Sequence, residues 1–219
     1  MPGNVPGVGL HLSQNAEADK VISANPFALL MGMLLDQQVM IEVAFAAPAE
    51  LQRRLGKKLS PALVASMDPD ELAAVFVQRP ALHRYPGSMA RRVHGTSRVL
   101  VEEYGGRADN VWKGVSSGKE LVGRLEALPG FGDQKARIFA ALLGKQLGVQ
   151  PDGWREASTP YGEQGCFRSV ADIVDTETLT RVRAFKQDLK AATKASAQGA
   201  TAGSATRATR ATRAKARTR

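Results

Sequence analysis

The stretch that decides the fold runs from Leu125 to Phe139 and reads LEALPGFGDQKARIF. Gly130 and Gly132 predict a tight turn between two helices, because glycine permits backbone conformations and close approaches that a Cβ atom would block. Small Ala136 allows the two helices to cross closely. Apolar residues at helical spacing lock the helices together: Leu125, Leu128, Phe131 and Phe139. The amides of the turn, and the free amides that open the second helix, form a ready anion site.

This arrangement is the helix–hairpin–helix pattern, which here extends over about residues 121–148 and grips a DNA phosphate through backbone groups. The alternative interpretation is an antiparallel helix pair that ends in a glycine cap and binds no ligand. Under the first interpretation, contacts to DNA are expected from five residues of the turn and the second helix: Gly130, Phe131, Gly132, Gln134 and Lys135.

Outside the hairpin the chain also predicts helices. Asn25, Ser60 and Asp68 each stand directly before a proline, the usual pairing of a helix cap with the first helical position. No stretch alternates between apolar and polar residues over the length of a strand, and no Asn-Gly hairpin signal occurs. The sequence therefore predicts an all-α protein, built as a compact bundle of short helices.

Most of the positive charge is concentrated at the C-terminal end. The 219 residues carry a net charge of +9, but the part from Ala195 onward holds six basic and no acidic side chains, which leaves +3 on the rest. Ala-Thr-Arg is repeated three times over 205–213. Because such low complexity cannot bury apolar surface, residues 195–219 are predicted to be a disordered basic tail. The tail either tracks DNA phosphates without sequence preference or merely solubilises the chain.

Composition excludes several other classes of protein. A single cysteine, Cys166, rules out a disulfide framework, a cysteine-based zinc site and a four-cysteine iron–sulfur cluster. No basic region followed by an apolar run is visible near the start, so no secretory signal is expected. The longest uncharged apolar stretch, 21–35, is interrupted by a proline and is too short to span a bilayer. We therefore expect a cytoplasmic protein without a membrane partner.

The chain resembles the helix–hairpin–helix DNA glycosylases, the superfamily of endonuclease III, the adenine glycosylases and the alkylpurine glycosylases. Three separated blocks match in the right order over roughly residues 20–155. The first block, 25–39, is similar to the helix and turn that carry a glutamine into the DNA duplex. The second block, 85–106, is similar to the helix that leads towards the hairpin, and the third block is the hairpin itself.

The resemblance implies a concrete reaction. Members of this superfamily flip a damaged nucleotide out of duplex DNA into a cleft between two helical lobes and cut its N-glycosidic bond. A carboxylate stabilises the positive charge of the oxocarbenium-like transition state and aligns water. In bifunctional members a lysine two residues after the second hairpin glycine forms a Schiff base, but here that position is Gln134. Lys135 follows about 100° further around the helix and should point elsewhere, so a monofunctional glycosylase is expected.

The essential carboxylate of the family lies some twenty residues beyond the same glycine, a count that reaches Asp152. The local sequence Pro-Asp-Gly departs from the family pattern and is also typical of an ordinary turn. Asp152 is therefore either the catalytic carboxylate or a turn residue. Asp172 and Asp36 are less favoured alternatives for the catalytic role.

Further residues complete the expected site. The resemblance makes Gln38 the wedge that fills the gap left by the flipped base, and the alternative is a polar residue that satisfies a helix break. Tyr85, Trp154 and Tyr161 could stack on the flipped base, although such aromatic residues more often fill a core. The iron–sulfur loop frequent in the family is absent, so no cofactor is expected. The hairpin backbone could hold a monovalent cation, as similar hairpins do.

These features predict a two-lobed, all-α domain of the helix–hairpin–helix glycosylase type over residues 8–194, followed by the basic tail. The expected function is hydrolytic excision of a damaged base, and Gln37-Gln38-Val39 with the missing lysine favours the alkylpurine-glycosylase side. The expected partner is double-stranded DNA, bound by a nucleoid-associated monomer. The alternative is a non-catalytic module that kept the hairpin and binds DNA without the chemistry.

Overall fold

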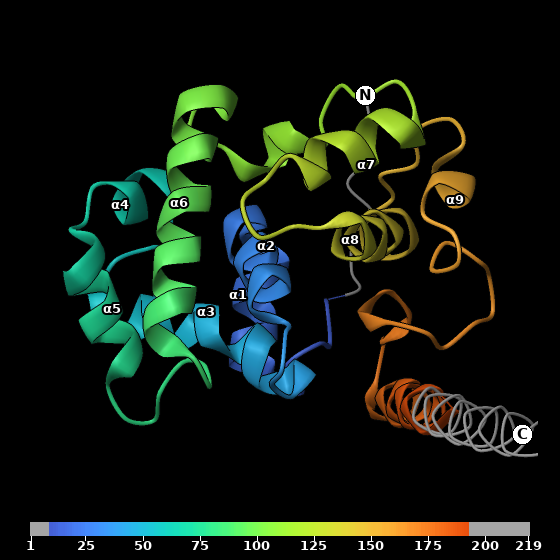
Figure 1. Cartoon of the computed structure of the whole chain (residues 1–219), viewed down its shortest axis with the longest axis horizontal. Helices are drawn as coiled ribbons and strands as arrows, with labels where there is room; N and C mark the ends of the chain where they lie inside the picture. Colours follow the sequence, from blue (N-terminus) through green and yellow to red (C-terminus); the bar gives the residue numbers. More distant parts are fainter. Residues whose placement is uncertain (1–8, 193–219) are drawn as a thin grey trace, which may run out of the picture.

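A computed structural model describes residues 9–192, and every regular element within them is helical (Figure 1). In chain order the elements are α1 (Ala16–Ala24), α2 (Pro26–Leu35), α3 (Ile41–Leu55), α4 (Pro61–Ala65), α5 (Pro69–Val77), α6 (Pro86–Tyr104), η1 (Ala108–Val111), α7 (Gly118–Glu126), α8 (Asp133–Gln146), α9 (Trp154–Ala157) and η2 (Val170–Asp172). A further helix, called here the C-terminal helix, covers 176–192. The all-α prediction is confirmed. The predicted tail and the predicted domain bounds at 8 and 194 lie outside the described residues.

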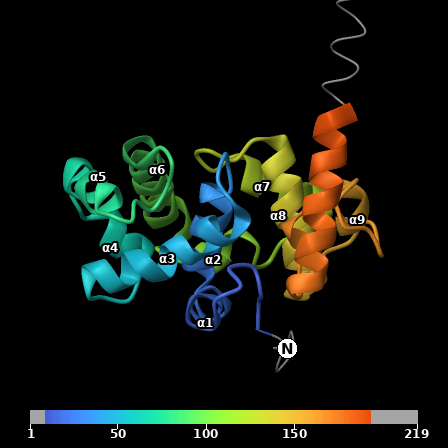
Figure 2. The same ribbon diagram turned by 90° about the horizontal axis from the view of Figure 1, so that it is seen from below.

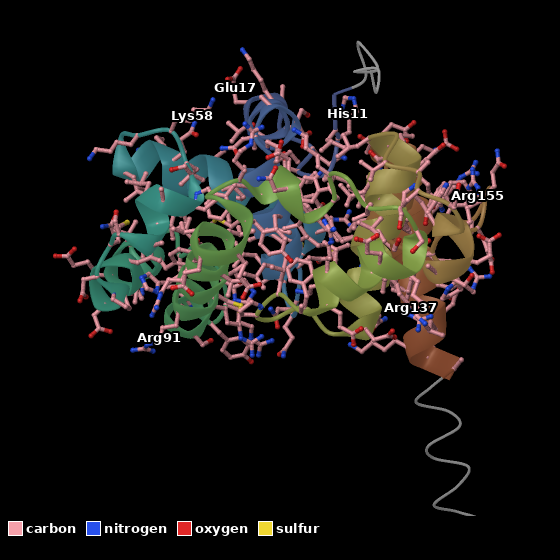
Figure 3. The ribbon with its side chains drawn as sticks, turned by 90° about the horizontal axis from the view of Figure 1, so that it is seen from above. His11, Glu17, Lys58, Arg91, Arg137 and Arg155 are labelled. Carbon is pink, nitrogen blue, oxygen red and sulfur yellow. The ribbon has the colours of Figure 1, made fainter. Side chains whose placement is uncertain are left out.

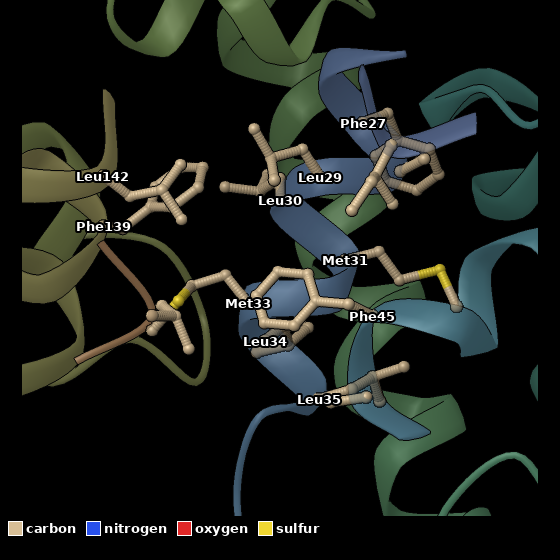
Figure 4. Close-up of a cluster of buried hydrophobic side chains, with 14 of the residues drawn as sticks. Phe27, Leu29, Leu30, Met31, Met33, Leu34, Leu35, Phe45, Phe139 and Leu142 are labelled. Atoms are coloured by element: carbon tan, nitrogen blue, oxygen red, sulfur yellow. The ribbon is translucent and has the colours of Figure 1, made fainter. Parts of the chain in front are cut away.

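Helix α2 is the centre of the fold. Every one of its residues after Pro26 is buried, so it is apolar on all sides. Helix α3 approaches it at Gly32, where an added Cβ atom would lie 2.6 Å from the Phe45 ring. Figure 4 shows Phe45 of α3 against α2, while Phe139 of α8 lies on the side of α2 away from α3. The core therefore continues through α2 from one half of the molecule to the other.

The remaining helices flank this centre on two sides. Figures 1 and 2 show α4, α5 and α6 on one side of α2, and α7, α8 and α9 on the other. One continuous cluster of buried apolar side chains joins both flanks. Among the described residues no single helix is long and apolar enough to cross a membrane. The combination of α1 and α2 meets that test only as a pair bent by 115°.

The three helix starts predicted from the sequence are confirmed. The Asn25 side chain accepts hydrogen bonds from the amides of Phe27 and Ala28, and its Nδ2 donates to the Leu59 carbonyl at 2.9 Å. Ser60 and Asp68 cap α4 and α5 in the same way, through amides two or three residues further on. The first of these caps also fixes the segment after α3 against the start of α2.

The predicted helix pair around Gly130 is also confirmed. Helix α7 ends at Glu126 and α8 begins at Asp133, and the four apolar residues predicted to lock the pair are all buried. Ala136 is completely buried between the helices. The Thr96 hydroxyl of α6 donates to the Pro129 carbonyl at 2.9 Å, which ties the turn to the opposite flank.

The C-terminal helix closes the fold on the side of α8 and α9 (Figure 2). Leu179 and Val182 anchor it in the common core. Arg183 forms an ion pair with Glu42 in the first turn of α3. The helix therefore connects the α8 side of the molecule with the segment that follows α2.

Candidate functional site

A cleft of about 560 Å³ opens where the turn after α2 meets the first turn of α8. Residues 36–39 form one wall, and Gln134, Lys135 and Ile138 of α8 form the next. The segment after α9 contributes Tyr161, and the C-terminal helix completes the lining. Four segments that are far apart in the sequence therefore meet around one space that has both apolar walls and polar groups.

The turn after α2 presents Gln38 to solvent. Gln38 is exposed and adopts a left-handed conformation with φ of 56°, which is uncommon for a residue with a side chain. Neighbouring Gln37 is held in place, because its Nε2 donates to the Leu34 carbonyl at 2.9 Å and its Oε1 accepts from Arg92 at 3.1 Å. The exposed glutamine is thus mounted on a turn that the rest of the molecule fixes. This geometry suits the wedge predicted from the sequence, although the role itself stays a prediction.

His83 supports the same turn from behind. Its Nδ1 accepts a hydrogen bond from the Tyr85 amide at 3.0 Å, so the ring proton is on Nε2, which donates to the Gln37 carbonyl at 2.9 Å. Both ring nitrogens are satisfied only in this neutral form. Burial lowers the pKa of His83 below its ordinary value and favours the same form.

Asp36 and Lys135 bring a carboxyl and an amine to the lining of the cleft. Burial raises the pKa of the Asp36 carboxyl, while the positive charges of Lys186 and Lys135 oppose that rise. Lys135 donates from Nζ to the Leu34 carbonyl at 2.7 Å, and burial lowers its pKa to about 8 against the attraction of Asp36. A carboxyl and an amine with pKa values shifted towards neutrality, in one cleft, are typical of a catalytic site.

Four of the residues predicted for the site line this cleft: Gln38, Gln134, Lys135 and Tyr161. Gln134 and Tyr161 also contact each other, since the glutamine Nε2 donates to the tyrosine hydroxyl at 2.9 Å. Lys135 points to a different partner from Gln134, since its Nζ donates to the Leu34 carbonyl, but both residues line the cleft. The cleft wraps around the first turn of α8, so adjacent positions of the helix both face it.

Of the two interpretations of Asp152, the structure fits the turn residue, because Asp152 does not line this cleft. Asp152 is exposed and lines a different groove on the other side of α8, together with Asp133 and Arg137, the latter labelled in Figure 3. Its carbonyl accepts from the Gly118 amide at 2.7 Å, so its backbone has the structural role of a turn that docks on the start of α7.

The two other carboxylates considered from the sequence, Asp172 and Asp36, lie in different surroundings. Asp172 is buried in an ion pair with Lys145 at 2.6 Å and accepts from the backbone amides of Arg168 and Ser169, which makes it structural. Asp36 is the one carboxylate among the described residues that line the cleft. The sequence did offer Asp36, but only as a lesser alternative, because counting along the chain favoured Asp152.

The predicted aromatic residues behave differently from one another. Only Tyr161 lines the cleft. Trp154 is buried against Gly144 and is a core residue, and Tyr85 lies exposed beside Arg84, behind the turn that carries Gln38. Phe185 of the C-terminal helix is a cleft aromatic that the sequence did not single out. Its signal was the helical spacing of Leu179, Val182, Phe185 and Leu189, which predicts an amphipathic helix over about 176–194 but does not distinguish Phe185 from a core residue.

The hairpin turn is accessible next to the cleft. Gly130, Gly132, Asp133 and Gln134 are exposed, and no side chain caps the start of α8, so the amides of its first turn face outward. Phe131 can offer DNA only its main chain, because its side chain is buried against Phe139 with ring centroids 6.0 Å apart. The turn thus has the accessible backbone that the predicted phosphate contact requires.

No model of a known protein family and no curated protein sequence matches the chain. Within residues 9–192, no group of three or more histidine, cysteine, aspartate or glutamate side chains is gathered closely enough to hold a metal ion.

Proposed function

We propose that the protein is a DNA glycosylase of the helix–hairpin–helix type, which excises a damaged base flipped out of double-stranded DNA. The observation that carries the proposal is the cleft, in which Asp36, Lys135 and Tyr161 meet beside the exposed wedge residue Gln38 and the hairpin turn. A concave space with apolar walls and a few convergent polar groups is the usual form of a binding site. The two flanks around α2 fit the two-lobed architecture that the resemblance implies.

The binding step follows from the accessible surfaces. The amides around Gly132 take a DNA phosphate, and the positive end of the α8 dipole strengthens that contact. Gln38 then enters the duplex and fills the gap that the flipped nucleotide leaves. The base passes into the adjacent cleft, where Tyr161 offers a stacking surface. Protein contacts thereby offset the cost of unstacking the base.

In this proposal the catalytic carboxylate is Asp36 and not Asp152. As the bond between C1′ and the base nitrogen breaks, its electron pair leaves with the base and positive charge develops on the sugar. The Asp36 carboxylate stabilises that charge, and a water molecule adds to C1′ and gives up a proton, which is taken up by the base that has left. The carboxyl must be ionised to do so. Since burial raises its pKa, activity should fall as pH drops through that raised value.

A second candidate is a glycosylase that also nicks the strand, and the position of Lys135 favours it. A pKa of about 8 leaves part of this amine neutral near neutral pH, and the amine lines the same cleft. The neutral amine would bond to C1′ as the base leaves. Loss of a proton from nitrogen and opening of the sugar ring would then give an imine. This candidate replaces water by Lys135 and keeps every other part of the proposal.

The test compares Asp36→Asn with Asp152→Asn on duplexes that carry a panel of lesions, alkylated purines among them. We expect excision to fall about 100-fold or more in Asp36→Asn, as on loss of a group that stabilises the transition state, and to stay near wild type in Asp152→Asn. Activity lost in Asp152→Asn and kept in Asp36→Asn would contradict this assignment. Background rates on every lesion with DNA binding intact would favour the non-catalytic binding module.

Borohydride trapping separates the two catalytic candidates. Wild-type protein and Lys135→Gln are incubated with a duplex that contains an abasic site, and the imine is reduced to a stable covalent bond. Hydrolysis predicts no trapped complex in either protein. A complex formed by wild type and absent in Lys135→Gln would establish the lysine mechanism instead.

A further inference from the structure

The C-terminal helix forms the side of the cleft opposite the hairpin. Three of its residues line the cleft, namely Phe185, Lys186 and Leu189, although all three lie beyond Val182, the last buried residue of the helix. Burial in the core therefore does not account for the position of the helix beyond Val182. Its apolar and charged side chains adjoin the same space as Asp36.

The helix is fixed in this place from two directions. Arg183 is paired with Glu42 of α3, immediately beyond the turn that carries Gln38. On the other side, the guanidinium of Arg181 lies 4.8 Å from the centre of the Phe167 ring, and that of Arg168 lies 5.8 Å from the Phe185 ring. These contacts hold Lys186 at the cleft between the start of α3 and the segment after α9.

Three cations from three elements face the cleft with Asp36, but they are engaged differently. Lys135 of α8 is committed to the Leu34 carbonyl, and Arg168 is paired with Glu163 at 3.0 Å. Lys186 makes no hydrogen bond or ion pair with another described residue. Its charge acts on Asp36 across the cleft. The helix thus brings one uncommitted cation to the proposed catalytic carboxyl.

We propose that the C-terminal helix is a functional wall of the cleft, and that Lys186 on it is the positioning residue whose charge holds Asp36 as a carboxylate. The catalytic consequence rests on the proposed function, whereas the charge relation does not. Burial favours the neutral acid of Asp36, and Lys135 loses its own charge above a pKa of about 8. Lys186, by contrast, lies exposed at the rim of the cleft.

The exposed position of Lys186 also suits catalysis. A buried contact between lysine and carboxylate would neutralise the negative charge that the transition state needs. An exposed lysine acts through water, which weakens its attraction and leaves the carboxylate available to the sugar. The effect should therefore depend on ionic strength, because salt screens exposed charges over about 10 Å at 0.1 M.

The experiment follows the side-chain carboxyl carbon of Asp36 by NMR during a pH titration of the full chain. The Lys186→Gln change should move the titration midpoint to higher pH, and Lys186→Arg should restore it. Lys190→Gln is the matched control: it makes the same charge change one turn along the same helix, at a residue that does not line the cleft. High salt should reduce the difference between Lys186→Gln and wild type.

Equal midpoints in Lys186→Gln and Lys190→Gln, with both proteins folded, would overturn the proposal. The acid limb of the excision rate should shift with the NMR midpoint, in the same direction. A shifted midpoint in a protein without excision activity would leave the charge relation in place and contradict the proposed function. An active protein with an unshifted midpoint would overturn the charge relation and leave the proposed function in place.

Discussion

Gly130 and Gly132 stand two positions apart in one turn, but they are glycines for different reasons. Gly130 has φ of +85°, and a Cβ atom there would lie 2.6 Å from Cδ1 of Leu34. Gly132 has an ordinary φ of −98°, and a Cβ atom there would meet nothing of the protein within 4 Å. The fold therefore requires glycine at position 130. At position 132, glycine leaves open the space that a DNA phosphate would occupy under the proposed function.

Alanine at each position should separate these two roles. Gly130→Ala should cost about 1–3 kcal/mol of the free energy of unfolding, through the strained backbone and the clash with α2. Gly132→Ala should cost about 1 kcal/mol or less, as a poorer helix cap, and should weaken DNA binding because the methyl group blocks the phosphate. Urea unfolding and fluorescence anisotropy with a labelled duplex measure the two effects. Unchanged DNA affinity in Gly132→Ala would contradict the phosphate contact.

His83 should make the stability of the fold depend on pH. Its pKa is lowered in the folded state from a value of 6.5, so below about pH 6.5 the unfolded chain binds a proton that the folded chain does not. The free energy of unfolding should therefore fall as pH drops below 6.5, and His83→Gln should remove this part of the fall. Urea unfolding at pH 7 and pH 5 measures it. If wild type and variant lose equal stability between these pH values, His83 has no such role.

At the scale of the element, a helix cap can also bind a neighbouring segment of the chain. The caps of α1 and α2 are both asparagines whose side chains accept from two amides of the first turn. Asn25 differs from Asn15 because it also donates to the buried Leu59 carbonyl. The cap residue of the central helix therefore joins two segments, and the cap residue of α1 does not.

This difference predicts unequal costs for the same substitution. Asn15→Ala should lose only the cap, about 1 kcal/mol. Asn25→Ala should cost about 2–3 kcal/mol, because it also leaves the Leu59 carbonyl without its donor. Thermal and urea unfolding of the two variants provide the comparison. Equal destabilisation would show that the bond to Leu59 contributes nothing.

At the scale of the whole molecule, charge is divided between the described body and the basic segment after it. The body supplies the hairpin and the cleft, while six basic side chains follow Ala195. If these side chains contact phosphates, they release counterions from the duplex. They would then raise affinity without changing which base is excised.

Removal of residues 195–219 should make DNA affinity less sensitive to salt. The slope of log affinity against log salt should become shallower by up to about five, the value for six phosphate contacts. Titrations at several salt concentrations, on the full chain and on a chain that ends at Lys194, measure the slope. Excision at saturating DNA serves as the control and should not change. An identical slope would assign the segment a solubilising role.

Several features of the fold could be predicted from the sequence because their causes are local. A cap acts on amides two or three residues away, and a glycine at positive φ marks its own turn. The apolar spacing of 3.6 residues per turn made the pair around Gly130 recognisable, down to the burial of Phe131 and Phe139. The helix caps at Asn25, Ser60 and Asp68 could be predicted for the same reason.

The candidate site was predictable only in part, because it depends on how distant segments meet. Gln38, Gln134 and Tyr161 were found through motifs or composition, but the choice among Asp36, Asp152 and Asp172 was not local. The count from Gly132 to Asp152 took no account of the chain's return along the other side of α8, where Asp152 docks on α7.

The sequence by itself determined the helices, their caps and the glycine turn, since hydrogen bonds and backbone sterics over a few residues suffice for these. Only the tertiary structure decided that Asp36, Lys135 and Lys186 share one cleft. Their juxtaposition depends on the packing of α2, α8 and the C-terminal helix around a common core. The shifted pKa values of Asp36 and Lys135 arise from that packing, because burial and opposing charge exist only once the segments have met.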